Sequence, residues 1–131
     1  MNNFATITIW GLRILAAVIL LQTLFFKFTA APESVYIFSR LGLEPWGRIG
    51  TGILELVAAV LLLIPATTAF GALLSVSLMA GAIFFHLTKL GISVLDDGGQ
   101  LFIYALVVLV SSTALVVIYR NDILKILKLR L

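Results

Sequence analysis

The chain has 131 residues, of which 62% are hydrophobic and 11% charged, and its mean hydropathy is +1.19. Because about a quarter of the residues in soluble domains are charged, this composition excludes an ordinary soluble enzyme. With no cysteine and one histidine, the chain cannot supply thiolate chemistry, an iron–sulfur cluster or, within one copy, a bis-histidine haem. The net charge is +3, and the basic residues are scattered and lie toward expected helix ends. This distribution indicates that they contact a membrane surface and not nucleic acid.

Four apolar runs are long enough to cross a bilayer core of roughly 30 Å, which takes about 20 helical residues. They cover residues 6–28, 46–64, 67–88 and 100–119. Pro65 ends the second run, and Arg120 with Asn121 ends the fourth. The sequence therefore predicts an all-α protein in which residues 1–131 form one domain, an integral membrane bundle of four transmembrane helices.

The connections between these spans differ in character. Residues 30–45 mix apolar and charged side chains, which predicts a short amphipathic helix at the membrane interface. Residues 89–99 are polar and glycine-bearing, whereas the turn at Pro65 is too tight to hold a site. With four spans, the two longer connections share one side of the membrane, and a water-facing site is expected there.

The tail after the fourth span predicts the orientation. Arg120, Lys125, Lys128 and Arg130 alternate there with aliphatic residues, which indicates a helix lying on the membrane surface. Because basic residues favour the cytoplasmic side, we expect both termini in the cytoplasm, at a bacterial cytoplasmic (inner) membrane. In the third span, Gly71 with Ser75 and Ser77 with Gly81 are spaced for close helix packing.

Charged residues within the spans are the candidates for function, because burying a charge at the bilayer centre costs about 2.5–3.5 kcal/mol. Glu55 follows Trp46 by nine residues, about 13 Å along the helix and close to the midplane. Among its basic candidates, Arg48 lies two turns nearer the surface and Lys27 can reach water by itself. The sequence therefore predicts a pair between Arg13 and Glu55. This pair either fixes the register of two spans or lines a cavity for a headgroup, a quinone carbonyl or a proton.

His86 is the second candidate, near the outer end of the third span. It is either a hydrogen-bonded anchor or a residue that relays protons or contacts a quinone. One histidine with Asp96 and Asp97 in a loop is a weak metal signal, so no metal site is expected.

Short motifs along the chain resemble the DoxX family of small four-helix membrane proteins over nearly the whole length. They are Arg13-Ile14-Leu15, Phe26-Lys27-Phe28, Gly42, Gly52-Ile53-Leu54-Glu55-Leu56, Met79-Ala80-Gly81-Ala82 with His86, and Gly98-Gly99. The chain departs from the family at Gln100, where members often carry an acidic residue, and at Pro65, where many have glycine. The resemblance implies quinone-linked membrane redox chemistry, since some relatives are subunits of a thiosulfate:quinone oxidoreductase.

The leading hypothesis is an integral membrane subunit of a quinone-linked redox system. A quinone or similar lipid would bind in a pocket between the first three spans, with Arg13 and Glu55 as its floor and Lys27, Arg48 and His86 as its polar mouth. The sequence identifies no catalytic residue and no redox cofactor motif, so electrons would come from a partner protein or the bound molecule. The alternative is a non-catalytic membrane scaffold in which the buried charges are structural.

Overall fold

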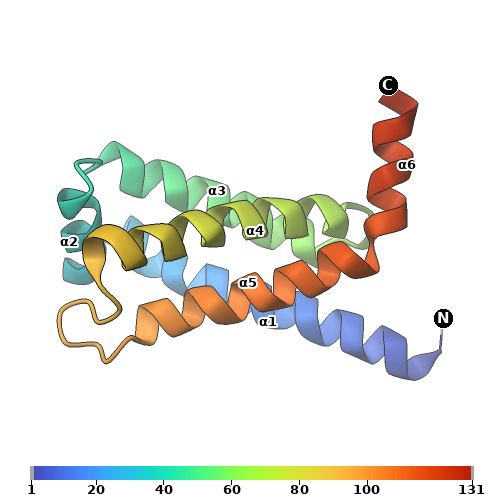
Figure 1. The fold of residues 1–131 in the computed structure, drawn as a ribbon, viewed down its shortest axis with the longest axis horizontal. Helices are drawn as coiled ribbons and strands as arrows, with labels where there is room; N and C mark the ends of the chain where they lie inside the picture. The colour runs from blue at the N-terminus through green and yellow to red at the C-terminus, as the bar shows by residue number, and fades with distance from the viewer. Residues whose placement is uncertain (1, 131) are drawn as a thin grey trace.

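The computed structural model describes residues 2–130, which form an all-helical bundle (Figure 1). Its long helices are α1 (Asn3–Phe28), α3 (Trp46–Leu63), α4 (Thr68–Phe85) and α5 (Gln100–Ile118), and its short ones are α2 (Pro32–Arg40) and α6 (Arg120–Arg130). A 3₁₀ turn, η1 (Pro65–Thr67), precedes α4, and a π-helical turn, η2 (His86–Leu90), extends it.

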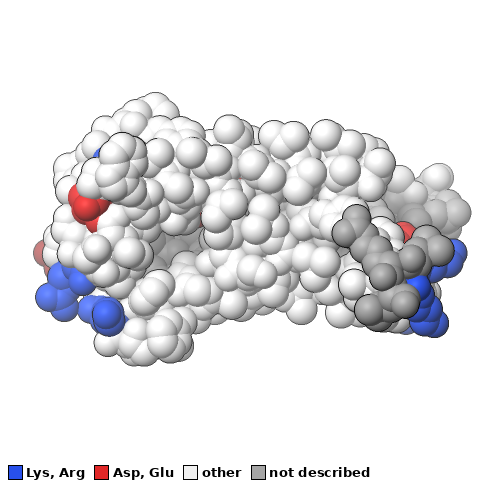
Figure 2. All heavy atoms as spheres, turned by 90° about the horizontal axis from the view of Figure 1, so that it is seen from above, with Lys and Arg blue, Asp and Glu red and all other residues white. Residues whose placement is uncertain are grey.

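Four of these segments are long and apolar enough to cross a membrane: Asn3–Phe28, Trp46–Leu63, Pro65–Leu90 and Gln100–Ile118. The predicted spans are confirmed to within a few residues, as are the helices expected in the first connection and in the tail. Large apolar side chains such as Val18, Phe25, Ile53 and Val110 are exposed along the bundle, as lipid contact requires. On the face shown in Figure 2, charged side chains gather at the two ends of the bundle, and the surface between them is formed by uncharged residues.

The four long helices form a closed ring, since α1 packs on α3, α3 on α4, α4 on α5, and α5 on α1. Both termini lie at one end of the bundle, and α2 lies at the other with the connection between α4 and α5 (Figure 1). The core contains fully buried alanines, including Ala16, Ala17, Ala58, Ala59 and Ala72. Small side chains of this kind let lipid-embedded helices approach closely.

Close packing between α3 and α4 depends on Gly71. A Cβ atom there would lie 2.6 Å from the backbone nitrogen of Leu62, so only glycine fits without displacing the backbone. The expected packing role of Gly71 is therefore confirmed. The same expectation is wrong for Gly81, where an added Cβ would meet nothing within 4 Å, because this residue faces a cavity.

Helix α1 is longer than its neighbours, and its surplus lies at the N-terminus. At 1.5 Å per residue its 26 residues extend about 39 Å, against about 27 Å for the 18 residues of α3. The register is set by contacts near both ends, where Arg48 of α3 meets Lys27 and Arg13 meets Leu62. The first turns of α1 therefore pass beyond the end of α3 (Figure 1).

Candidate ligand-binding cavity

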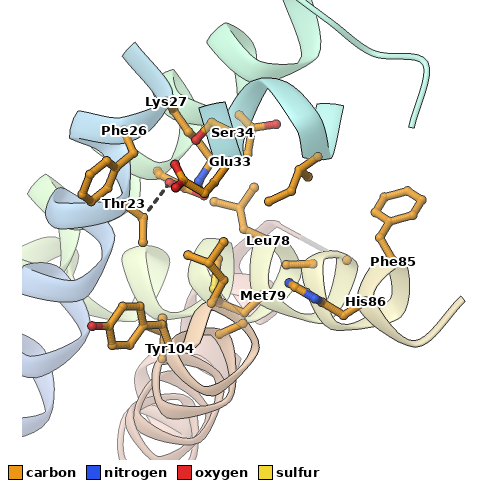
Figure 3. Close-up of a pocket in the computed structure, with 18 of the residues that line it drawn as sticks. Thr23, Phe26, Lys27, Glu33, Ser34, Leu78, Met79, Phe85, His86 and Tyr104 are labelled. Atoms are coloured by element: carbon orange, nitrogen blue, oxygen red, sulfur yellow. Dashed lines mark hydrogen bonds and ion pairs between the residues drawn. The ribbon is translucent and has the colours of Figure 1, made fainter. Parts of the chain in front are cut away.

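A cavity of about 470 Å³ lies between α1, α2, α4 and α5, toward the end of the bundle that carries α2. Its walls are mainly apolar, and Figure 3 shows side chains from several helices directed into it. Its polar lining residues are Gln22, Thr23, Lys27, Glu33, Ser34, Thr51, Glu55, Ser77, His86, Asp97, Gln100 and Tyr104. The expected location between the first three spans is only partly right, because α5 forms a wall and α3 contributes just Thr51 and Glu55.

The buried charge in this cavity is the pair formed by Lys27 and Glu55. The Lys27 Nζ lies 3.1 Å from Glu55 Oε1, and the Thr23 hydroxyl donates to Glu55 Oε2 at 3.3 Å. Thr23 precedes Lys27 by one helical turn, so both reach the carboxylate from the same face of α1. Glu55 is only 3% exposed, and the side chain of Lys27 only 16%. The expectation that Lys27 reaches water by itself is therefore wrong.

Arg13 is not the partner of Glu55. Its Nε donates to the Leu62 carbonyl at 2.7 Å, and its guanidinium lies 3.6 Å from the centre of the Trp10 ring. Leu62 comes seven residues after Glu55, about 10 Å farther along α3. The predicted pair is therefore wrong, because the antiparallel register of α1 and α3 places Arg13 level with the end of α3 and not with its middle.

Arg48 is also directed away from the cavity. Its Nε lies 2.9 and 3.0 Å from the two carboxylate oxygens of Glu44, and its Nη1 donates to the Lys27 carbonyl in the last turn of α1. The last carbonyls of a helix lack partners within the helix, and a basic side chain can satisfy them. Arg13 and Arg48 thus have the same role: each caps the C-terminus of the neighbouring helix, and neither lines the cavity.

His86 is held by a hydrogen bond and also lines the cavity. It is buried in η2, and its Nδ1 lies 2.9 Å from the Gly91 carbonyl, which confirms the hydrogen-bonded anchor. Because a carbonyl only accepts, Nδ1 carries a proton, which leaves Nε2 of the neutral ring as an acceptor. The imidazole lines the cavity near Met79 (Figure 3).

Asp97 is a cavity residue that organises the loop before α5. Its carboxylate accepts hydrogen bonds from the backbone N–H groups of Val94, Gly99 and Leu101 at 3.0, 2.8 and 3.2 Å. Burial alone would raise the pKa of Asp97, but these backbone hydrogen bonds bring it below its ordinary value.

Sequence reasoning missed several polar residues of the cavity. Thr23 could have been found from its position one turn before Lys27. Tyr104 could have been found from Gln100, one turn earlier on α5, whose side-chain amide donates to the Tyr104 hydroxyl at 2.8 Å. Within residues 2–130, no cluster of three histidine or acidic side chains is arranged to hold a metal ion.

Comparison with known protein families identifies one that covers most of the chain. Residues 11–115, which include every motif quoted above, match the DoxX-like family. No curated protein and no solved structure is a significant match. Four membrane-spanning helices and a family match over most of the sequence lead to one conclusion: this chain is a membrane protein that belongs to the DoxX-like family.

Proposed function

We propose that this protein is the membrane subunit of a quinone-linked redox system and binds a quinone, or a lipid of similar build, in the cavity. The observation that carries the proposal is an apolar cavity into which a buried ion pair and a histidine converge. Small-molecule sites are usually apolar hollows of about 300–1,000 Å³ with a few polar groups that orient the ligand. The cavity, at about 470 Å³, falls within this range.

The polar groups suit both redox forms of a quinone. The oxidised ring presents carbonyl acceptors, toward which the Lys27 ammonium can donate. The reduced ring presents hydroxyl donors, for which Nε2 of neutral His86 is an acceptor. Phe26, Leu78 and Met79 supply apolar surface around these groups (Figure 3). The ligand would thus gain or lose protons at residues of this chain.

The cavity edge favours a ligand with a hydrocarbon tail. Gln22 and Phe26 of α1 and Gln100 of α5 line the cavity and are exposed, so the cavity is open at these residues. Within a membrane span, such a surface faces lipid. A tail could therefore leave the cavity between α1 and α5 and lie in the bilayer, while the headgroup stays beside Lys27.

In this proposal the protein resides in a bacterial cytoplasmic membrane with both termini in the cytoplasm, so that the cavity lies toward the opposite side. The chain carries no redox cofactor motif, and a partner protein would exchange electrons with the bound quinone. The contacts of Arg13 and Arg48 with helix ends favour a second candidate, a non-catalytic scaffold in which Lys27 and Glu55 are structural as well.

The test is direct detection of the ligand followed by a variant that fills the cavity. Protein purified in gentle detergents should carry an extractable quinone. Gly81→Leu, which places a side chain in the cavity, should weaken binding of a quinone analogue by about tenfold or more. Ala80→Leu, on the exposed side of the same helix, is the matched control and should bind normally. Absence of quinone in every detergent, with equal binding by both variants, would favour the scaffold.

A further inference from the structure

A second, smaller hollow lies at the opposite end of the bundle, where α1 runs past the end of α3. It measures about 170 Å³ and is lined by Thr6, Ile9, Trp10, Arg13, Pro65 and Tyr119. It lies at the end that carries the termini, and none of its residues lines the larger cavity. An inference drawn from it is therefore independent of the proposed quinone site.

Arg13 leaves hydrogen-bonding capacity unused in this hollow. A guanidinium has five N–H donors. The side chain is 2% exposed and its Nε bonds to the Leu62 carbonyl, yet Nη2 is buried without a partner among the residues that the structure describes. The Trp10 ring covers the guanidinium and supplies a cation–π contact but no acceptor. A buried charged donor without an acceptor is unfavourable, so an external acceptor would stabilise it.

The residues that the structure describes offer this cation no counter-ion. Among the described residues, no carboxylate lies within ion-pair distance of Arg13, and the first turn of α1 holds no acidic residue. Asp122 on α6 is the acidic residue at this end, and it is outnumbered there by Arg120, Lys125 and Lys128. The remaining acidic residues line the large cavity or lie in the connections at the other end: Glu33, Glu44, Glu55, Asp96 and Asp97. The described residues leave Nη2 of Arg13 without an acceptor, and an anion from outside them would supply both the acceptor and the counter-charge.

The depth of the hollow identifies the source of that anion. Arg13 lies level with Leu62, one residue before the end of α3, and therefore near the membrane boundary. Trp10 and Tyr119 line the same hollow, and such aromatic residues are enriched at the level of lipid headgroups. Phosphate oxygens are strong acceptors for a guanidinium.

We propose that the Arg13 hollow binds the phosphate of an anionic phospholipid headgroup. The basic residues of α6, at the same end, raise the local concentration of anionic lipid. The guanidinium then holds one lipid molecule more tightly than the general surface charge would.

The experiment compares an anionic with a zwitterionic phospholipid, whose acyl chains are identical and whose headgroups differ in net charge. Full-length protein is loaded with phosphatidylglycerol or phosphatidylcholine of identical chains, and the lipid retained through detergent washing is measured by native mass spectrometry. Wild type should retain phosphatidylglycerol preferentially. Arg13→Gln should lower that retention by about tenfold, roughly the effect of one charge-assisted hydrogen bond. The control Arg120→Gln removes an exposed cation at the same end and should change retention by less than about twofold.

The remaining outcomes also decide the proposal. If Arg13→Gln does not fold, Arg13→Lys keeps the charge but not the planar fork and should lose part of the preference. Equal retention of the two lipids by wild type, or equal losses in the Arg13 and Arg120 variants, overturns the site. Displacement of phosphatidylglycerol by inorganic phosphate overturns the lipid assignment and leaves a site for soluble phosphate.

Discussion

At the scale of single residues, the buried basic side chains of the spans divide into two kinds. Arg13 and Arg48 donate to carbonyls at the ends of neighbouring helices, whereas Lys27 pairs with Glu55 beside a cavity. The planar, multi-donor guanidinium can satisfy helix-terminal carbonyls, and the single ammonium on a flexible stem can reach across to a carboxylate. The residue types alone were compatible with several pairings, and the contacts distinguish them.

The first prediction concerns the Lys27–Glu55 pair. Lys27→Leu and Glu55→Leu should each lower the free energy of unfolding by about 3 kcal/mol, because each leaves a buried charge without its partner. The double variant should recover about 1–3 kcal/mol of the summed loss in a detergent unfolding assay. Arg13→Leu combined with Glu55→Leu is the control and should be additive. Additive losses for Lys27 and Glu55 would show that the pair is not coupled.

The second prediction concerns Asp97 and pH. Its folded pKa lies below the ordinary value, so its contribution to stability is present above that value, about 3.9, and is lost as the pH falls through the folded pKa. Asp97→Asn should cost about 1 kcal/mol at pH 7, because asparagine lacks the negative charge and has one acceptor oxygen where the carboxylate uses two. The difference from wild type in thermal unfolding should shrink below pH 4. Asp96→Asn, an exposed neighbour, should have little effect at either pH.

At the scale of elements, the glycines of α4 distinguish a packed face from a cavity face. Gly71 meets the backbone of α3, whereas Gly81 has open space beside it. Both were expected to pack, because their spacing among small residues is similar. A pattern of small residues indicates that close approach is allowed, and only the neighbouring helix determines whether it occurs.

The third prediction follows from this contrast. Gly71→Ala should destabilise the bundle by about 1–3 kcal/mol, because the added methyl group meets the Leu62 backbone. Gly81→Ala should be neutral or stabilise by up to about 1 kcal/mol, because alanine restricts the unfolded chain and fits the helix better. Unfolding in mixed detergent micelles measures both. Equal destabilisation would contradict the hairpin packing of α3 on α4.

At the scale of the whole molecule, four spans place the termini at one end and the α2 connection at the other. Because the tail is basic, reporter fusions after Pro65 and after Leu131 should both read cytoplasmic. Fusions within residues 30–45 and 89–99 should read outside. Opposite readings for Pro65 and the C-terminus would contradict an even number of crossings. If the fusions after Pro65 and after Leu131 both read outside, the orientation is reversed and the large cavity lies toward the cytoplasm.

The sequence by itself determined the helical class, the four spans, the helices of the first connection and the tail, and the DoxX-like family. These are properties of local composition and motif order, which no distant contact needs to supply. It also singled out Lys27, Glu55 and His86, which do line the cavity.

Only the tertiary structure decided which charges meet and where the cavity lies. Lys27 rather than Arg13 reaches Glu55, α5 forms a wall of the cavity, and the two arginines cap helix ends. Each of these depends on the register of antiparallel helices. A shift of seven residues moves a side chain by about 10 Å, and no local pattern specifies that shift, because it is set by how the helices pack along their whole length.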